Sequence, residues 1–136
     1  MDQSVIQRQG LLKKALTVNA VFSVFSGVVI LLANRWLVRF LGLSDQVSLT
    51  ILGVSLIIFA TILWLNARRP RIRIVDAWVA VIMDAAWVVS SYTMIFLVPL
   101  RVGGKWVIAL VAEVVLAFAI LQWIGIRRVR SSERYA

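Results

Sequence analysis

The sequence predicts an all-α membrane protein, a four-transmembrane-helix bundle, and three observations support this prediction. Hydrophobic residues make up 62% of the 136-residue chain, against roughly 45 to 50% in a soluble domain. The mean hydropathy is +0.94. The Lys and Arg residues separate four apolar stretches, each long enough to cross about 30 Å of hydrocarbon at about 1.5 Å per residue.

These stretches define four expected spans in a single integral membrane domain, 1–136. They are residues 15–34, 46–67, 75–98 and 106–126. Eleven Lys and Arg residues lie in the two terminal segments and in the link between the second and third spans, whereas four lie in the other two links. Because basic residues concentrate on the cytoplasmic side, we expect both termini to face the cytoplasm.

The links carry weaker signals. The link from Asn34 to Gln46 has a brief amphipathic pattern, which is typical of a segment that lies in the headgroup plane. Ser44 is the expected N-cap of the second span, and Asp45 would complement the helix dipole. The link 99–105 contains Gly103-Gly104 and is expected to form only a turn.

Two pairs of spans resemble each other. The second and fourth spans end alike at an offset of 59 residues, where the same residues recur: Phe59-Ala60, Trp64 and Arg68-Arg69 as Phe118-Ala119, Trp123 and Arg127-Arg128. The first and third spans match at an offset of 65 residues, at which Asn19-Ala20 corresponds to Asp84-Ala85. We infer two helical hairpins related by an axis along the membrane normal. The alternative is chance, because membrane interfaces alone favour Trp and Arg.

Two acids lie in the middle of the spans, Asp84 in the third and Glu113 in the fourth, with no Lys, Arg or His inside a span to pair with them. In the repeat they stand where the first hairpin has Asn19 and Val54. A charged side chain at the bilayer centre costs roughly 2.5 to 3.5 kcal/mol, which marks it as a candidate for function. The candidate intramembrane polar site comprises Asp84, Glu113, Trp87, Asn19, Ser23, Ser26 and Ser91.

Two interpretations of these acids remain open. Either acid could form a structural clamp between helices. Each of its hydrogen bonds would stabilise the helix packing by about 0.6 kcal/mol and at most about 2 kcal/mol. Alternatively, at least one acid titrates or binds a cation, an interpretation favoured because a neutral Asn or Gln would form a clamp at lower insertion cost. The depths of Asp84 and Glu113 differ little, so the two acids could interact if their faces meet.

Charge and composition exclude several classes of site. With no Cys and no His, the chain offers no disulfide, iron–sulfur cluster, or imidazole haem or zinc site, and we expect neither a metal nor a cofactor. The basic residues are confined to ends and links, so nucleic-acid binding is not expected. The positive-inside rule explains the cytoplasmic Arg clusters, which could also recruit anionic lipid headgroups: Arg68, Arg69, Arg71, Arg73, Arg127 and Arg128.

One family resemblance is visible in the first half. The run Ser26-Gly27-Val28-Val29-Ile30-Leu31-Leu32, followed by Trp36-Leu37 and Leu41-Gly42-Leu43, resembles the first hairpin of small four-span bacterial membrane proteins of the DoxX-like kind. The resemblance implies a four-helix inner-membrane bundle and transfers no catalytic residue. Small multidrug-resistance exporters differ, because they carry their essential Glu in the first span, where this chain has only Asn19.

Three functions are compatible with these observations. The leading one is a small membrane protein with a binding or structural role and no enzymatic activity, such as an accessory subunit of a larger membrane complex. The second is a proton- or cation-coupled transporter that acts as a homo-oligomer through Asp84 and Glu113. The third is a carrier or enzyme for a lipophilic molecule, which would use Trp87 and the two acids to line a midplane pocket.

Overall fold

The computed structural model describes residues 3–134, with only the backbone described for 3–6, 8 and 132–134. Within that part the chain forms five helices and no strand: α1 (Gln3–Leu32), α2 (Asn34–Leu41), α3 (Val47–Ala67), α4 (Ile74–Leu97) and α5 (Val102–Arg134). Helices α1, α3, α4 and α5 are long and apolar enough to cross a membrane. The predicted all-α, four-span architecture is therefore confirmed.

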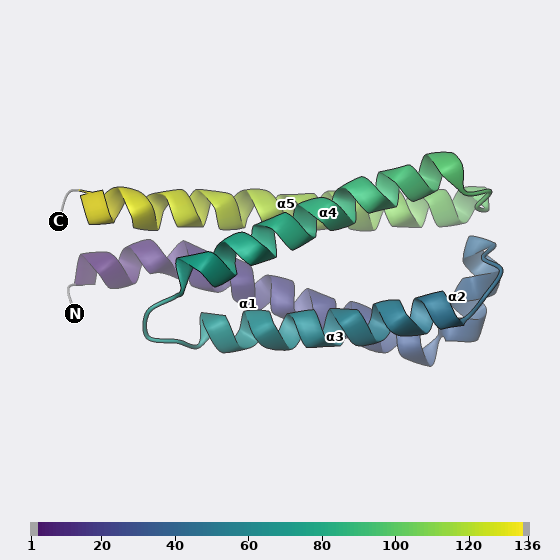
Figure 1. Ribbon diagram of the computed structural model, residues 1–136, viewed down its shortest axis with the longest axis horizontal. Coiled ribbons are helices and arrows are strands. Elements are labelled where there is room, and N and C mark those ends of the chain that lie inside the picture. Colours follow the sequence, from purple (N-terminus) through teal and green to yellow (C-terminus); the bar gives the residue numbers. More distant parts are fainter. Residues whose placement is uncertain (1–2, 135–136) are drawn as a thin grey trace.

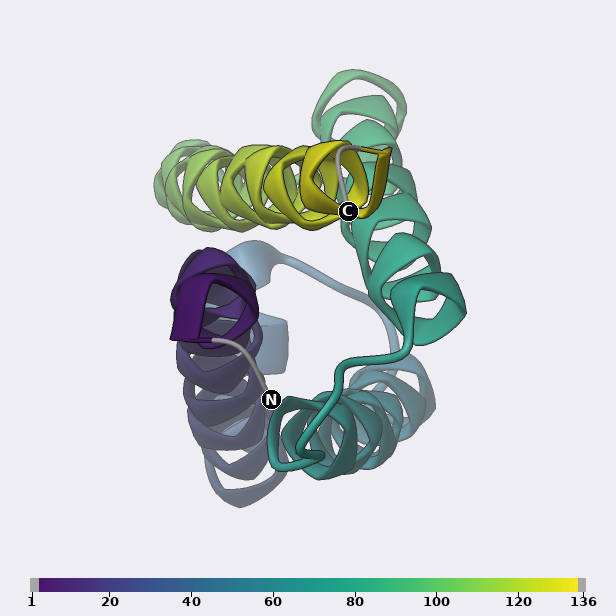
Figure 2. The same cartoon turned by 90° about the vertical axis from the view of Figure 1, so that its left-hand side faces the viewer.

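The long helices form two hairpins that pack together. Helix α1 pairs with α3, α4 pairs with α5, and α1 also packs along α5. Helices α3 and α4 start close together at their connecting turn and then diverge, with α4 crossing α5 obliquely (Figures 1 and 2). Both termini lie at one end of the bundle, which we call the terminal end, and α2 covers the other, the α2 end (Figure 1).

The contact between α1 and α3 depends on two glycines. A Cβ on Gly27 would lie 2.8 Å from the carbonyl oxygen of Gly53, and a Cβ on Gly53 would lie 3.1 Å from the carbonyl oxygen of Gly27. Small residues allow helix backbones in a membrane to approach this closely. The buried apolar core lies nearer the terminal end, where all four long helices contribute: Leu12, Leu16, Ala20, Leu63, Ala67, Ile72, Ala77, Ala80, Ile126 and Val129.

The helix boundaries differ from the predicted spans at three places. The second and third spans agree with α3 and α4 within one residue. Helix α1 ends at Leu32, within two residues of the predicted 34, but it begins at Gln3 rather than at residue 15. Helix α5 runs from Val102 to Arg134, beyond both ends of the predicted 106–126. Lys and Arg mark the edge of the hydrocarbon but are good helix formers, so charge does not end these helices. The side chains of Arg8 and Arg134, counted for orientation, lie outside the described residues.

The α2 end contains a short helix, and it corrects one expectation. The amphipathic segment after α1 is helical and ends at Leu41. Gly42 caps this helix, with a left-handed φ of 79°, and donates its N–H to the Val38 carbonyl oxygen at 3.0 Å. The expected turn at Gly103-Gly104 is wrong, because both glycines lie in the first turn of α5. Gly104 instead lets α5 approach α2, since a Cβ there would lie 3.0 Å from the Cα of Leu41.

The start of α3 is capped by Asp45 rather than by Ser44. Helix α3 begins at Val47, and Asp45 Oδ1 accepts the backbone N–H of Ser48 at 2.8 Å. The predicted N-cap at Ser44 is therefore wrong, because the chain enters the helix later than expected. The hydrogen bond from the Ser48 N–H lowers the pKa of the Asp45 carboxyl.

Two contacts repeat between the hairpins. The Arg68 guanidinium lies 5.5 Å from the centroid of the Trp64 ring, and Arg127 lies 4.9 Å from that of Trp123. These pairs have the 59-residue offset seen in the sequence. The wider packing is not symmetric, because α1 packs along α5 whereas α3 and α4 contact each other little. Descent of the two hairpins from a duplication remains a prediction.

Candidate functional site

Asp84 lies inside the bundle, with only 3% of its surface exposed. It shares its helix face with Ala77 and Ala80, which are buried at 0% and 1% exposure. Their small side chains allow α4 to approach its neighbours closely. The pattern of small residues around this acid therefore marks the inward face of α4.

One carboxyl oxygen of Asp84 joins three helices. Asn19 on α1 donates an Nδ2 hydrogen to Asp84 Oδ2 at 2.7 Å, and Gln122 on α5 donates an Nε2 hydrogen to the same oxygen at 2.8 Å. Ser23 donates its hydroxyl to Asn19 Oδ1 at 3.2 Å. We call these four residues the Asp84 network. Asn19 and Asp84, which correspond in the sequence repeat, are thus bonded to each other.

Two buried polar atoms close to the Asp84 network have no hydrogen-bond partner. They are Gln122 Oε1 and Trp87 Nε1. Gln122 is fully buried, with 0% exposure, and Trp87 follows Asp84 by about one helical turn. An unsatisfied buried polar group typically costs about 1 to 3 kcal/mol. Among the described residues, the Trp87 indole N–H therefore has no hydrogen-bond acceptor.

The remaining predicted residues do not bond to Asp84. Ser91 is buried, but its hydroxyl donates to the carbonyl oxygen of Trp87 at 2.8 Å, within its own helix. Ser26 is half-buried and takes no part in the Asp84 network. Of the predicted neutral partners, the structure thus brings only Asn19 and Ser23 together with the acid.

Glu113 occupies a different environment. It is exposed on the surface of α5, where Tyr92 of α4 donates its hydroxyl to Glu113 Oε1. Nine residues, or about two and a half helical turns, separate it from Gln122, so these two side chains point to opposite faces of α5. The two acids, whose relative facing the sequence leaves open, do not meet, because Asp84 bonds inward to Gln122 while Glu113 faces outward and bonds to Tyr92.

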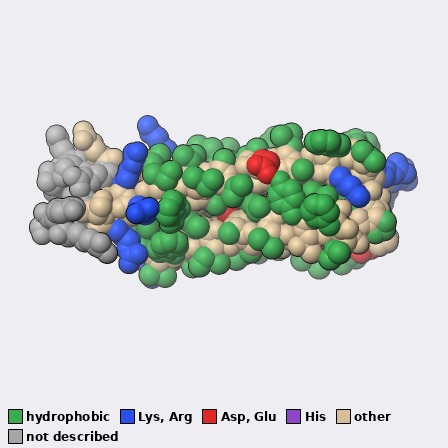
Figure 3. All heavy atoms as spheres, turned by 90° about the horizontal axis from the view of Figure 1, so that it is seen from above, with side chains coloured by type: hydrophobic (Ala, Val, Ile, Leu, Met, Phe, Trp, Pro, Cys, Tyr) green, Lys and Arg blue, Asp and Glu red, His purple; other side chains and the backbone are tan. Residues whose placement is uncertain are grey.

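The surface around the bundle separates charge from apolar side chains. Figure 3 shows a hydrophobic belt with Lys and Arg at its two ends and acidic atoms within the belt. Glu113 is eight residues from Lys105, about 12 Å along the helix axis. This carboxyl is therefore exposed at a depth where hydrocarbon is expected.

The sequence interpretation missed two partners, Gln122 and Tyr92. Gln122 is a polar residue in an otherwise apolar stretch of α5, and its nine-residue distance from Glu113 already places it on the opposite face. Tyr92 lies eight residues after Asp84, but a tyrosine near a membrane interface is ordinarily an anchor. Its bond to Glu113 depends on the oblique crossing of α4 over α5, which no local pattern encodes.

The Arg clusters lie at the terminal end. All six predicted headgroup residues are exposed: Arg68, Arg69, Arg71, Arg73, Arg127 and Arg128. Arg73 Nε lies 3.6 Å from Asp76 Oδ2, an exposed pair that contributes little. Between residues 3 and 134, where side chains are described, no three His, Cys, Asp or Glu residues gather to hold a metal ion.

The fold and the candidate site define the class of protein: a multi-pass helical membrane protein with one buried carboxyl network and one exposed intramembrane acid. No protein-family model, curated protein or solved structure matches this chain.

Proposed function

We propose that this protein is a small, non-enzymatic subunit of a membrane complex in the bacterial inner membrane, with both termini in the cytoplasm. The distribution of eleven Lys and Arg residues against four supports the orientation. The observation that carries the proposal is Glu113, exposed in the hydrophobic belt with Tyr92 as its one hydrogen-bond partner among the side chains that the structure describes. The exposed carboxyl is the point of association.

The free energies favour a partner at Glu113. A charged side chain near the bilayer centre costs roughly 2.5 to 3.5 kcal/mol. A single intramembrane hydrogen bond, such as that from Tyr92, contributes about 0.6 kcal/mol and at most about 2. The bond within the chain therefore offsets only part of the cost. A helix from another protein that brings further donors to Glu113 would offset the rest.

The chemistry of the chain indicates what kind of partner this is. The spans hold no Lys, Arg or His, so a second copy cannot supply a cation to Glu113. The hydroxyl of Tyr92 is already used by the Glu113 of its own chain. We therefore infer a different membrane protein, whose transmembrane helix presents a Lys or an Arg at this depth. Ala117, exposed one turn beyond Glu113, allows that helix to approach closely.

The Asp84 network supports the same proposal from inside the bundle. By joining α1, α4 and α5 it fixes the position at which α4 crosses α5, and hence the position of Tyr92 beside Glu113. Coupled transport through both acids has less support, because Asp84 and Glu113 lie on opposite sides of α5. In this account Asp84 is a structural clamp and Glu113 is the contact.

Co-purification from native membranes in a mild detergent tests the proposal. The wild-type chain should retain another membrane protein in near-stoichiometric amount, and Glu113→Leu should lose it. Val54→Leu is the matched control, because Val54 is the repeat counterpart of Glu113 and is also exposed, at 45%. A wild-type chain that purifies alone or only with copies of itself, or a Glu113→Leu variant that keeps its partner, would rule the proposal out.

A further inference from the structure

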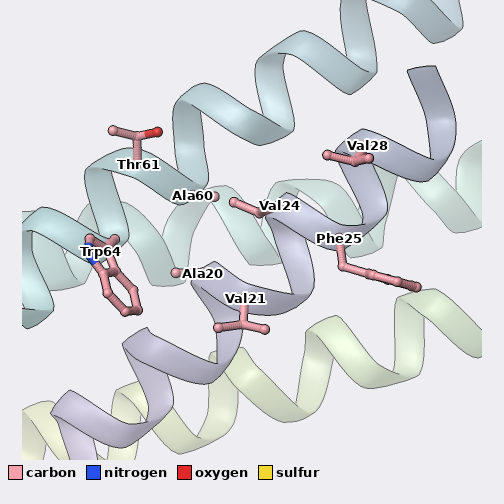
Figure 4. A pocket seen from close by; sticks show the side chains of 8 residues that line it. All are labelled: Ala20, Val21, Val24, Phe25, Val28, Ala60, Thr61 and Trp64. Atoms are coloured by element: carbon pink, nitrogen blue, oxygen red, sulfur yellow. The ribbon is translucent and has the colours of Figure 1, made fainter. Parts of the chain in front are cut away.

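An apolar groove runs between α1 and α3 on the outer surface of the first hairpin. It has a volume of about 560 Å³ and is lined by Ala20, Val21, Val24, Phe25, Val28, Ala60, Thr61 and Trp64. Buried Ala20 and Ala60 lie between the two helices, and Trp64 reaches toward Ala20 and Val21 (Figure 4). The side walls of the groove are more exposed than its floor at Ala20 and Ala60: 58% of the surface of Val21 and 67% of that of Phe25 is exposed.

The chemistry of the groove suits a hydrocarbon chain. Thr61 is the one lining residue with a hydroxyl, and that hydroxyl donates to the Ile57 carbonyl oxygen at 2.9 Å. The groove therefore offers a ligand apolar contact. Its α1 wall extends from Ala20 to Val28, about 12 Å along the helix axis, within the predicted hydrocarbon region.

Cations mark the end of the groove nearest the terminal end. The Arg68 guanidinium lies 5.5 Å from the ring centroid of Trp64, and among the described residues no acid pairs with it. On α1, exposed Lys14 precedes Val21 by seven residues, about two turns, and so lies on the same helix face. An anionic headgroup beside Arg68 and Lys14 would leave its acyl chain aligned with the groove.

We propose that the α1–α3 groove binds one anionic phospholipid, with its acyl chain between the helices and its phosphate at Arg68 and Lys14. Charge complementarity selects this occupant over a zwitterionic lipid, because a basic residue near the membrane surface favours anionic lipid by about 1 kcal/mol. The site lies on the first hairpin and is independent of the association proposed at Glu113.

The second hairpin provides an internal comparison. Trp123 and Arg127 make the same ring contact, at 4.9 Å, so the counterpart of Arg68 is retained, whereas Lys14 corresponds to Val79. At the offset of 65, however, the wall residues Val21, Phe25 and Val28 correspond to Ala86, Ser90 and Thr93. These shorter or polar side chains provide less apolar wall. The specific site therefore belongs to the first hairpin alone.

Native mass spectrometry of the purified full chain, titrated with phosphatidylglycerol or phosphatidylcholine, tests the proposal. The wild-type chain should retain one phosphatidylglycerol in preference to phosphatidylcholine. Arg68→Gln should weaken phosphatidylglycerol binding about fivefold, the equivalent of about 1 kcal/mol, and leave phosphatidylcholine unchanged. Phe25→Ala should weaken both lipids alike, because it removes apolar contact.

Two variants serve as matched controls. Arg127→Gln removes the equivalent cation from the second hairpin, and Phe96→Ala truncates a phenylalanine on α4 that is 81% exposed. Neither should change lipid binding. The proposal fails if Arg127→Gln weakens phosphatidylglycerol as much as Arg68→Gln does, if the wild-type chain does not prefer phosphatidylglycerol, or if Phe25→Ala binds as the wild type does. Phe25 is largely exposed, so its truncation leaves the helix contacts intact.

Discussion

The glycine contact between α1 and α3 predicts that an added methyl group will destabilise the bundle at one position and not at another. In Gly27→Ala the new Cβ would lie 2.8 Å from the Gly53 carbonyl oxygen and 2.9 Å from Ile57 Cγ1, whereas ordinary contacts begin at 3.4 Å. The carbonyl oxygen belongs to the backbone, so relief requires the two helices to separate. In Gly10→Ala, by contrast, the Cβ would meet no atom within 4 Å.

The magnitudes follow from two opposing effects. Overpacking of a well-packed contact costs about 1 to 3 kcal/mol, and replacing Gly by Ala inside a helix returns roughly 0.5 to 1 kcal/mol. We therefore expect Gly27→Ala to lower the free energy of unfolding by about 1 kcal/mol, and by no more than about 2.5 kcal/mol. Gly10→Ala, which has only the second effect, should raise it by about 0.5 to 1 kcal/mol.

The assay is reversible unfolding in mild-detergent micelles by addition of a denaturing detergent, followed by far-ultraviolet circular dichroism. Gly53→Ala should behave like Gly27→Ala, and the double variant should cost less than the sum because both changes disturb one contact. If Gly27→Ala proved as stable as Gly10→Ala, the close packing of α1 on α3 would be refuted.

Two further predictions concern single carboxyls. Asp84→Leu, which removes two hydrogen bonds and leaves the Asn19 and Gln122 donors unpaired, should lower the free energy of unfolding by about 1 to 3 kcal/mol in the same assay; an unchanged stability would contradict the clamp. The pKa of the Asp45 carboxyl is lower in the folded state than in the unfolded chain. The ionised cap therefore stabilises the fold at pH values above the ordinary carboxyl pKa of about 4, and this stabilisation is lost as the pH falls through the lowered pKa. The amide proton shift of Ser48 should therefore titrate with a midpoint below about 4 and stay constant in Asp45→Asn; a midpoint above 4 would contradict the cap.

The sequence predicted the four spans because apolar length and flanking charge are local properties. It also grouped Asn19, Ser23, Ser26 and Ser91 with Asp84 in one candidate polar site, and of these four residues the structure brings Asn19 and Ser23 into the Asp84 network. Helix ends at Gln3, Val102 and Arg134 were beyond this reasoning, because charged residues continue a helix outside the membrane as readily as they mark its edge.

The partners across helices could not be predicted in the same way. Whether Gln122 or Glu113 faces Asp84 depends on how α5 is rotated, and periodicity alone leaves that rotation open. The separation of the two acids and the pairing of Tyr92 with Glu113 depend on the crossing angle of α4 over α5. That angle results from packing along the whole bundle rather than from any one segment.

Site-specific photo-crosslinking in native membranes tests most directly whether the Glu113 surface contacts another membrane protein. A photoreactive amino acid at exposed Ala117, one turn from Glu113, should give a single adduct with a different protein, and that adduct should disappear when Glu113→Leu is added. The same amino acid at Ile58 of α3, which is 58% exposed, should give only lipid adducts. An adduct of twice the chain's mass at position 117, or lipid adducts alone, would contradict the proposed association.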